Sequence, residues 1–299
     1  MGSTASHAER RRLLLGLIGA GIGQSLTPAL HEEEGAAQGL RVHYQTIDLD
    51  RTASGVEALP QLLGAARTMG FAGLNITYPC KQAVLALLDA LAPEARAMGA
   101  VNTVVFDGVR AVGHNTDGRG WRWAFERGLP GADLGHVVLL GAGGAGAAIA
   151  HALMEMPVGR LSVVDAAPAR AHGLVAELRT LHPGRAVEIA TDPGEALAGA
   201  SGLVHATPTG MDKQPGLPLP AALLRPALWV SEVVYFPLVT PLLAAARACG
   251  CATLDGGGMA VGQAVLAFEL FTGRRPDAER MEAHLRRLLA ERAGATARA

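Results

Sequence analysis

The sequence has few cysteines, few aromatic residues and almost no net charge. Its 299 residues include only Cys80, Cys249 and Cys251, without a CxxC spacing. These provide neither a disulfide framework nor a zinc site, so we predict no metal site and a reducing, cytoplasmic location. Aromatic residues make up 4% and the formal net charge is -1. We therefore expect no nucleic-acid partner, because neither a base-stacking platform nor a basic surface is encoded.

Long hydrophobic runs are also missing, so we expect no membrane partner. Residues 10–23 combine basic residues with an apolar stretch, as a secretory signal does. The apolar stretch is short, no Ala-x-Ala site closes it, and a polar loop follows at residues 24–28. We therefore interpret residues 13–18 as a buried strand preceded by a polar, disordered tail at residues 1–12.

Apolar residues are abundant instead, at 49% against 18% charged residues, which is enough for a packed core. The chain is longer than one typical domain, so we expect two. Apolar runs alternate with helical patterns along it, and this alternation predicts an α/β fold with open sheets and crossover helices. The strands are expected at residues 13–18, 42–48, 72–76, 100–106, 136–140, 161–165, 187–190, 202–206 and 228–234. The helices are expected at residues 29–39, 56–68, 82–91, 118–128, 147–154, 169–181, 263–271 and 277–293.

A glycine-rich turn lies between the strand at residues 136–140 and the helix that follows it. A strand–GxGxxG–helix order is the Rossmann fingerprint for a dinucleotide, whose pyrophosphate binds the N–H groups at the start of the helix. A purely structural glycine turn is the alternative. The predicted cofactor-binding residues of this turn are Gly141, Ala142, Gly143, Gly144, Ala145 and Gly146.

The predicted domains follow from this turn. We expect a Rossmann dinucleotide-binding domain at residues 119–258. Residues 1–118 would form an α/β substrate-binding domain with an open mixed sheet, completed by residues 259–299, whose helices return to it.

Asp165 ends the strand after the glycine turn, 24 residues beyond Gly141. An acidic residue near this spacing accepts the ribose 2′-hydroxyl of NAD and repels the 2′-phosphate of NADP. The nearest basic residue is Arg170, a further candidate in cofactor binding. NAD is thus favoured over NADP. The alternative is that Asp165 only caps a turn.

Polar residues gather at residues 75–81, 99–103 and 113–117 of the first domain, and we interpret these segments as strand ends or the loops that follow them. Such loops line the ligand site of an open α/β sheet. Lys81 precedes an apolar segment, where partial burial suits a proton donor or acceptor, and Asp117 is a candidate partner. Each also has a plain interpretation as a solvated charge or a helix cap.

Eight motifs in order resemble the shikimate/quinate dehydrogenase family, over about residues 15–271. The resemblance implies oxidation of the ring 3-hydroxyl of a small-molecule substrate, shikimate or quinate, with NAD(P) accepting the hydride. The motifs are at residues 25–28, 75–81, 99–103, 115–117, 141–146, 206–210, 235–237 and 258–263.

The resemblance also implies residue roles. Lys81 and Asp117 match the catalytic pair. Ser25 and Thr27 match hydroxyls that hold the substrate carboxylate, although the two also suit a helix cap. Gln263 also suits a surface helix. The other matched substrate-binding positions are Thr77, Asn102, Asp117, Tyr235 and Gln263, and those near the nicotinamide are Thr207, Val233 and Gly258.

Two departures resemble the NAD-preferring quinate/shikimate branch of that family. Asp165-Ala-Ala stands where the NADP-using members usually have Asn-Arg-Thr, and Thr27 stands where they usually have serine. The alternatives are an NADP-linked shikimate or aminoshikimate dehydrogenase and, more distantly, a non-catalytic dinucleotide sensor. The preferred acid, the physiological direction and the choice between monomer and homodimer stay open.

Overall fold

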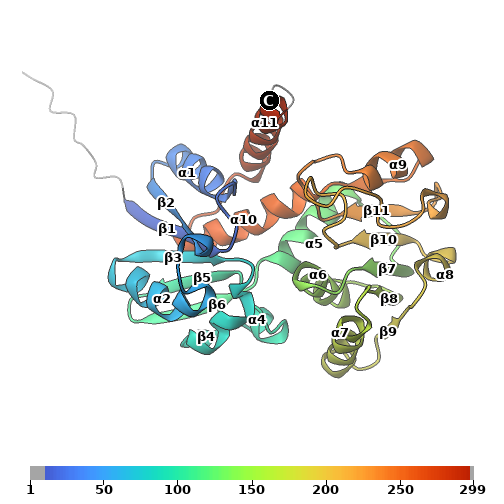
Figure 1. The fold of residues 1–299 in the computed structure, drawn as a ribbon, viewed down its shortest axis with the longest axis horizontal. Coiled ribbons are helices and arrows are strands. Elements are labelled where there is room, and N and C mark those ends of the chain that lie inside the picture. Colours follow the sequence, from blue (N-terminus) through green and yellow to red (C-terminus); the bar gives the residue numbers. More distant parts are fainter. Residues whose placement is uncertain (1–10, 297–299) are drawn as a thin grey trace, which may run out of the picture. The chain divides into compact units, whose positions relative to one another are not determined.

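The computed structural model describes residues 11–296, so residues 1–10 of the expected tail lie outside the described part. The chain divides into two compact units (Figure 1). The first unit comprises Met1–Asn115 and Ala264–Met281, and the second comprises Thr116–Gln263 and Glu282–Ala299. Each unit is built on its own sheet of six strands.

The first sheet is mixed, as expected. β1 pairs in parallel with β2 and β3, whereas β5 is antiparallel to β3 and β6, and the short β4 pairs in parallel with β6. The strand order is β2 (Arg41–Asp48), β1 (Arg12–Gly19), β3 (Phe71–Ile76), β5 (Thr103–Asp107), β6 (Arg110–His114) and β4 (Ala90–Leu91).

The apolar run at residues 13–18 is a buried strand, β1, which confirms the interpretation made from the sequence. Successive side chains of β1 point to opposite faces of the sheet. Leu15 and Leu17 pack with Phe271 of α10 (Gly256–Thr272). Ile18 packs on the other face, with residues of α2 (Leu59–Thr68) and of the segment after α3 (Cys80–Ala83). Both faces are thus covered, which explains a strand that is apolar throughout.

A buried carboxylate joins the C-terminal segment to α1 (Thr27–Ala37). Glu34 is 1% exposed, and its oxygens accept hydrogen bonds from Arg280 Nε at 2.8 Å and Nη2 at 2.9 Å. The backbone N–H of Asp277 donates to the same carboxylate at 2.9 Å. Arg280 belongs to the first turn of α11 (Ala278–Thr296). A buried charge needs partners of this kind, so the contact fixes the start of α11 against α1.

The prediction of a helix at residues 82–91 was wrong. α3 ends at Ala83, a 3₁₀ turn covers Val84–Leu87, and Ala90–Leu91 forms β4. Asp89 accepts the backbone N–H of Ala111 at 2.7 Å and returns its own N–H to the Ala111 carbonyl. Pairing with β6 therefore outweighs the helical pattern of apolar residues. A short helix not expected from the sequence, α4 (Pro93–Ala97), follows.

The second sheet is parallel throughout, and its strand order reverses at β7, as in a Rossmann-type fold. β7 lies between β8, the next strand in the chain, and β10. The order is β12 (Thr253–Leu254), β11 (Trp229–Glu232), β10 (Gly202–His205), β7 (His136–Leu140), β8 (Arg160–Val164) and β9 (Ala186–Ile189).

Helices cover both faces of this second sheet. Val137 and Leu139 of β7 pack with residues of α5 (Asp117–Gly128), α6 (Gly144–Met154) and α7 (Pro168–Leu181). Val138 and Leu140 point the other way, toward α8 (Pro193–Ala198) and α9 (Pro241–Cys249). The alternation along β7 thus produces the two layers of core.

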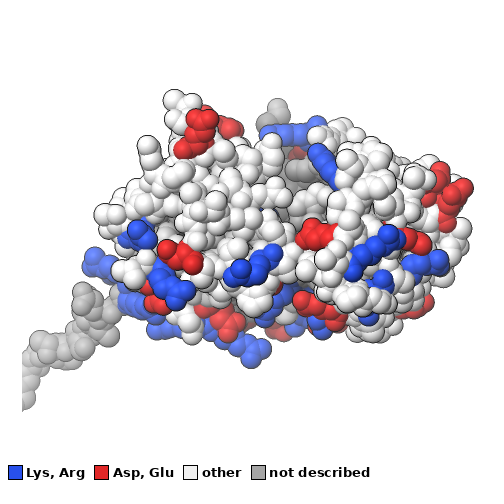
Figure 2. All heavy atoms as spheres, turned by 90° about the horizontal axis from the view of Figure 1, so that it is seen from below, with Lys and Arg blue, Asp and Glu red and all other residues white. Residues whose placement is uncertain are grey.

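The surface carries charges of both signs. On the face drawn in Figure 2, basic and acidic side chains are interspersed rather than gathered into one large area of a single sign. Among the helices at residues 11–296, none has the length and apolar character needed to cross a membrane.

The first unit encloses a histidine without polar partners. His31 is 0% exposed, and neither ring nitrogen has a hydrogen-bond partner within the described chain. Its ring stacks on Tyr44 and Phe268, with ring centroids 5.2 and 6.0 Å away. Burial lowers the pKa of His31 from 6.5 to about 3, because the protonated ring would lose its hydration.

This histidine makes folding stability dependent on pH. Between pH 6.5 and about 3 the unfolded chain binds a proton at His31 that the folded chain does not. The stability present above pH 6.5 is therefore lost as the pH falls, by about 1.4 kcal/mol per pH unit. We expect His31→Phe to flatten this part of the curve, measured as the free energy of unfolding in urea across acidic pH. His43→Gln, at a side chain 69% exposed, is the control. An unchanged slope in His31→Phe would contradict the assignment.

Candidate active site

The carboxyl ends of β1 and β3 lie side by side, and the loops after them carry several predicted substrate residues. The backbone N–H of Thr77 donates to the Ile18 carbonyl, and the N–H of Ala20 donates to the Tyr78 carbonyl, each at 2.9 Å. A Cβ on Gly19 would lie 2.3 Å from the Thr77 methyl group. Only glycine at this position lets Thr77 approach so closely, so the two loops form one polar edge of the sheet.

Ser25 and Thr27 lie at the start of α1, in the loop after β1. Ser25 Oγ accepts the backbone N–H of Thr27 at 3.3 Å. The helix N-cap is Leu26, without a side-chain cap, so the pair does not form the N-cap considered above. Ser25 closes the turn before the helix, and its hydroxyl proton is not used in this bond. Both side chains are partly exposed, as a substrate contact requires.

Asn102 is held by a buried hydrogen-bond chain whose other members the sequence did not single out. The Tyr44 hydroxyl donates to Asn75 Oδ1 at 2.6 Å, and Asn75 Nδ2 donates to Thr103 Oγ1 at 3.2 Å. Thr103 Oγ1 in turn donates to Asn102 Oδ1 at 2.9 Å. Burial raises the pKa of Tyr44 well above its ordinary value, so the phenol stays a donor. The chain fixes the orientation of the Asn102 amide.

Lys81 follows β3 in the short helix α3. The side chain is half-buried, and its backbone carbonyl accepts the N–H of Val101 at 2.8 Å, which ties α3 to the segment carrying Asn102. The neighbouring Cys80 is buried, and burial raises the pKa of its thiol. Asp117, 8% exposed, is the first residue of α5. Because Lys81 and Asp117 belong to different units, their pairing stays a prediction.

Within the second unit, α5 and α10 cross at glycines. A Cβ on Gly120 would lie 2.4 Å from the Gln263 nitrogen, and one on Gly262 would lie 2.3 Å from the Gly120 carbonyl oxygen. The close approach places Gln263 at the crossing, one helical turn from Asp117 along α5. Gln263 is half-buried there, and its amide donates to the Ala260 carbonyl at 2.9 Å. It is therefore not the fully exposed helix residue considered as the alternative.

The glycine turn connects β7 to α6 with almost no room for side chains. Gly141 has a φ of 108°, and a Cβ on Gly146 would lie 1.9 Å from the Gly141 carbonyl oxygen. Gly143 and Gly144 face open space instead, and no side chain caps α6. Uncapped N–H groups beside open space fit the pyrophosphate of a dinucleotide. Ala142 and Ala145 pack into the core beneath the turn.

Asp165 follows β8 and is bonded directly to the glycine turn. One carboxylate oxygen accepts the N–H of Ala142 and the other accepts that of Ala167, both at 2.7 Å. The second bond is the turn cap considered as the alternative, whereas the first ties Asp165 to the candidate cofactor site. Arg170 is exposed in the first turn of α7, and its side chain has no hydrogen-bond or ion-pair partner within residues 11–296.

The strand ends on the other side of β7 carry the positions expected near the nicotinamide. Thr207 follows β10, Val233 follows β11, and Gly258 lies in the first turn of α10. Tyr235, 39% exposed, comes two residues after Val233, and its predicted substrate contact stays a prediction.

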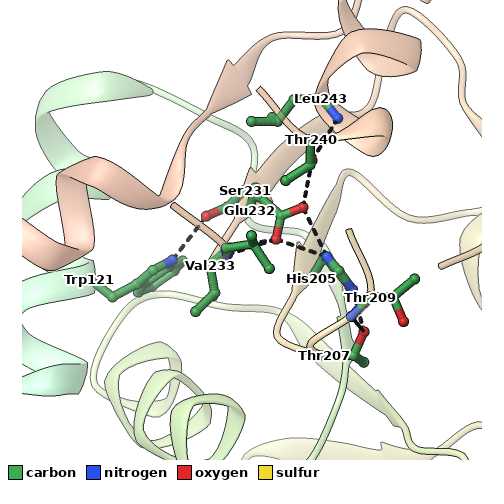
Figure 3. Close-up of polar contacts among 10 residues, drawn as sticks. Trp121, His205, Thr207, Thr209, Ser231, Glu232, Val233, Thr240 and Leu243 are labelled. Carbon is green, nitrogen blue, oxygen red and sulfur yellow. Dashed lines mark hydrogen bonds and ion pairs between the residues drawn. The ribbon is translucent and has the colours of Figure 1, made fainter. Parts of the chain in front are cut away.

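Sequence reasoning missed a buried pair at these strand ends. His205 and Glu232 are the last residues of β10 and β11, and the His205 ring contacts the Glu232 carboxylate at 2.8 Å (Figure 3). The available signal was a polar residue at the end of each of two apolar strands.

Comparison with known proteins gives the family. Residues 17–104 match the shikimate dehydrogenase substrate binding domain, and residues 256–286 match the shikimate 5′-dehydrogenase C-terminal domain. A relative from Streptomyces avermitilis, named shikimate dehydrogenase (NADP(+)), is 61% identical over 92% of this chain and 95% of its own length. One from Corynebacterium efficiens, named quinate/shikimate dehydrogenase (NAD(+)), is 50% identical over 91% of this chain and 96% of its own length.

A solved structure agrees with these relatives. Quinate dehydrogenase from Corynebacterium glutamicum, in complex with NAD, superposes with a TM-score of 0.88. It is 47% identical and covers 92% of this chain and 98% of its own. Both the substrate-binding unit and the Rossmann-type unit have counterparts in that structure. The chain therefore belongs to the shikimate and quinate dehydrogenase family of oxidoreductases.

Proposed function

We propose that this protein oxidises the ring 3-hydroxyl of shikimate or quinate to the 3-dehydro ketone, reversibly, with NAD as the preferred cofactor. The observation that carries the cofactor preference is the Asp165 carboxylate bonded to the glycine turn. The names of relatives leave the preference open, because the Streptomyces relative is named for NADP and the Corynebacterium relative for NAD.

The Asp165 carboxylate suits a ribose hydroxyl better than a phosphate. Each of its oxygens accepts one backbone hydrogen bond and retains a lone pair for a second donor. A ribose 2′-hydroxyl can donate to it, whereas a 2′-phosphate would bring like charges together. The exposed Arg170 supports the second candidate, an NADP-linked enzyme, because an unpaired guanidinium attracts phosphate. Its position in α7, five residues beyond Asp165, is a weaker argument than the direct bond to the turn.

The substrate would be held by hydroxyl and amide groups of the first unit. Ser25 and Thr27 offer neutral donors to the ring carboxylate, so no buried cation is required. The Asn102 amide, oriented through Thr103 and Asn75, suits ring hydroxyls. A site that bonds several hydroxyls rejects analogues that lack them, because its own polar groups would stay unpaired.

The oxidation breaks the ring C–H and O–H bonds together with formation of the carbonyl. When bound, NAD supplies the acceptor for the hydride. The Lys81 amine takes the hydroxyl proton and returns it in the reverse direction. Asp117, at the N-terminus of α5, is the proposed partner of Lys81 in this proton transfer. The free thiols of Cys80, Cys249 and Cys251 support a cytoplasmic location.

Initial rates with shikimate and quinate, each with NAD and NADP, test the proposed function. We expect NAD to give the higher kcat/KM with the preferred acid, because Asp165 disfavours the 2′-phosphate. Turnover with neither acid would contradict the activity. Turnover only with NADP would contradict the cofactor preference while leaving the activity intact.

The source of the cofactor preference is tested by replacing Asp165. Asp165→Asn combined with Ala166→Arg removes the negative charge and adds a partner for phosphate. We expect kcat/KM for NADP relative to NAD to rise at least about tenfold, roughly the value of one charged hydrogen bond. Asp192→Asn is the matched control, because Asp192 caps α8 after β9 of the same sheet. No change in the ratio would show that the ribose does not bind at Asp165.

The catalytic pair is tested by Lys81→Ala and Asp117→Asn. We expect kcat to fall by at least about 100-fold in each, the usual contribution of general acid–base catalysis, with the Kd for NADH unchanged. Lys213→Ala, at the chain's other lysine, which is exposed, serves as the control. Full activity of Lys81→Ala would remove the lysine from the mechanism. NADH binding without turnover in the unaltered protein would instead favour a dinucleotide sensor.

A further inference from the structure

The proposed mechanism makes no use of the ionisable pair His205–Glu232. The two residues are direct register partners at the ends of the neighbouring parallel strands β10 and β11. Their side chains are fully buried, and His205 Nδ1 lies 2.8 and 3.0 Å from the two carboxylate oxygens. Figure 3 shows the pair lying between the segments that follow the two strands.

The Glu232 carboxylate is surrounded by hydrogen-bond donors. One oxygen accepts the backbone N–H groups of Val233 at 2.8 Å and Val234 at 2.9 Å. The other accepts the hydroxyl of Thr240 at 2.9 Å, and Thr240 in turn caps α9. A buried carboxylate is costly unless such bonds are made. The carboxylate therefore holds the turn after β11 in one arrangement.

The His205 ring links the Glu232 carboxylate to the segment that follows β10. A carboxylate only accepts hydrogen bonds, so Nδ1 carries a proton and the ring orientation is fixed. Nε2 then meets the Thr207 hydroxyl. A carboxylate that orients an imidazole, which orients a hydroxyl, is the arrangement that hydrolases use to position a nucleophile. Here it positions the partly exposed Thr207 hydroxyl.

Both segments held by the pair border the candidate cofactor site. The Thr207 methyl lies 3.0 Å from where a Cβ on Gly141 would stand, so Thr207 adjoins the glycine turn. A Cβ on Gly256, at the start of α10, would lie 2.3 Å from the Val233 carbonyl oxygen. The end of β10 adjoins β7, where the strand order reverses and where dinucleotides bind in folds of this kind.

We propose that His205 and Glu232 are positioning residues for the nicotinamide half of the cofactor. Through Thr207 and the turn at Val233, they hold the two segments between which the reacting ring is placed for hydride transfer. This inference rests on the proposed function only in requiring a nicotinamide dinucleotide, and not on which acid or which dinucleotide is used.

Binding of whole and truncated cofactor separates positioning from stability. ADP-ribose lacks the nicotinamide but retains the groups expected at the glycine turn and at Asp165. In the full-length protein, we expect Thr207→Val and His205→Gln to weaken the calorimetric Kd of NADH by roughly tenfold and to lower kcat by about tenfold or more. The Kd of ADP-ribose should stay within about twofold of the unaltered protein's value. Losing one hydrogen bond changes affinity by roughly tenfold, and ADP-ribose lacks the nicotinamide half that this hydrogen bond is proposed to position. Thr207→Ser, which keeps the hydroxyl, should recover most of both losses.

Ser231→Ala is the matched control. Ser231 precedes Glu232 in β11 and accepts the Trp121 indole N–H at 3.0 Å, a buried bond outside the His205–Glu232 pair (Figure 3). Its loss should lower the melting temperature while leaving kcat and both Kd values unchanged.

Two results would overturn the inference. One is equal weakening of NADH and ADP-ribose in Thr207→Val, and the other is a Thr207→Val protein with kcat and NADH affinity like those of Ser231→Ala. Thr207 is partly exposed, so this variant carries the test even where His205→Gln does not fold. An unaltered protein that prefers NADP contradicts the proposed cofactor and leaves this test in place, run with NADPH and 2′-phospho-ADP-ribose.

Discussion

Backbone crowding at the turn after β7 determines how the second unit is arranged around its candidate cofactor site. A Cβ on Gly146 would come within 1.9 Å of the Gly141 carbonyl oxygen, and one on Gly141 within 2.7 Å of the Ala206 carbonyl oxygen. α6 therefore starts directly at the turn, with its uncapped end beside open space. Because β7 lies between β8 and β10, residues following both strands reach this turn: Asp165 by a hydrogen bond and Thr207 by packing.

The residues on the two sides of the glycine turn are proposed to act through different interactions: a charge on the β8 side and a buried hydrogen-bond network on the β10 side. On the β8 side a single carboxylate is proposed to select the dinucleotide, through the contrast between accepting a hydroxyl and repelling a phosphate. On the β10 side a buried network ending at Thr207 is proposed to orient the reacting half of the cofactor. In this proposal the choice between the two dinucleotides depends on the charge of Asp165, whereas hydride transfer depends on the geometry that the buried network maintains. The first unit repeats this design, since Asn102 is oriented by Thr103 and Asn75 from within its own sheet.

The glycine turn and the buried strand β1 could be predicted from the sequence because each depends on a short run of neighbouring residues. The glycine turn has its fingerprint within six residues, and the buried strand β1 is a continuous apolar run. The prediction of a helix at residues 82–91 failed because the apolar spacing there suits a helix. The interaction that decides the structure is the pairing of Ala90–Leu91 with β6, more than 20 residues away along the chain. His205 and Glu232 were missed for a similar reason: they are 27 residues apart and meet only through strand register. The motif resemblance supplied residue roles that spacing alone does not contain.

The proposed cofactor preference depends on binding of the adenosine ribose of NAD by the Asp165 carboxylate. A crystal structure of the protein with NAD tests it most directly, through the distance from the Asp165 oxygens to the ribose 2′-oxygen. We expect a hydrogen bond of about 2.5–3.0 Å between them, with the bond from the Ala142 N–H retained. A ribose turned away from Asp165, with the carboxylate bonded only to the N–H groups of Ala142 and Ala167, would contradict it.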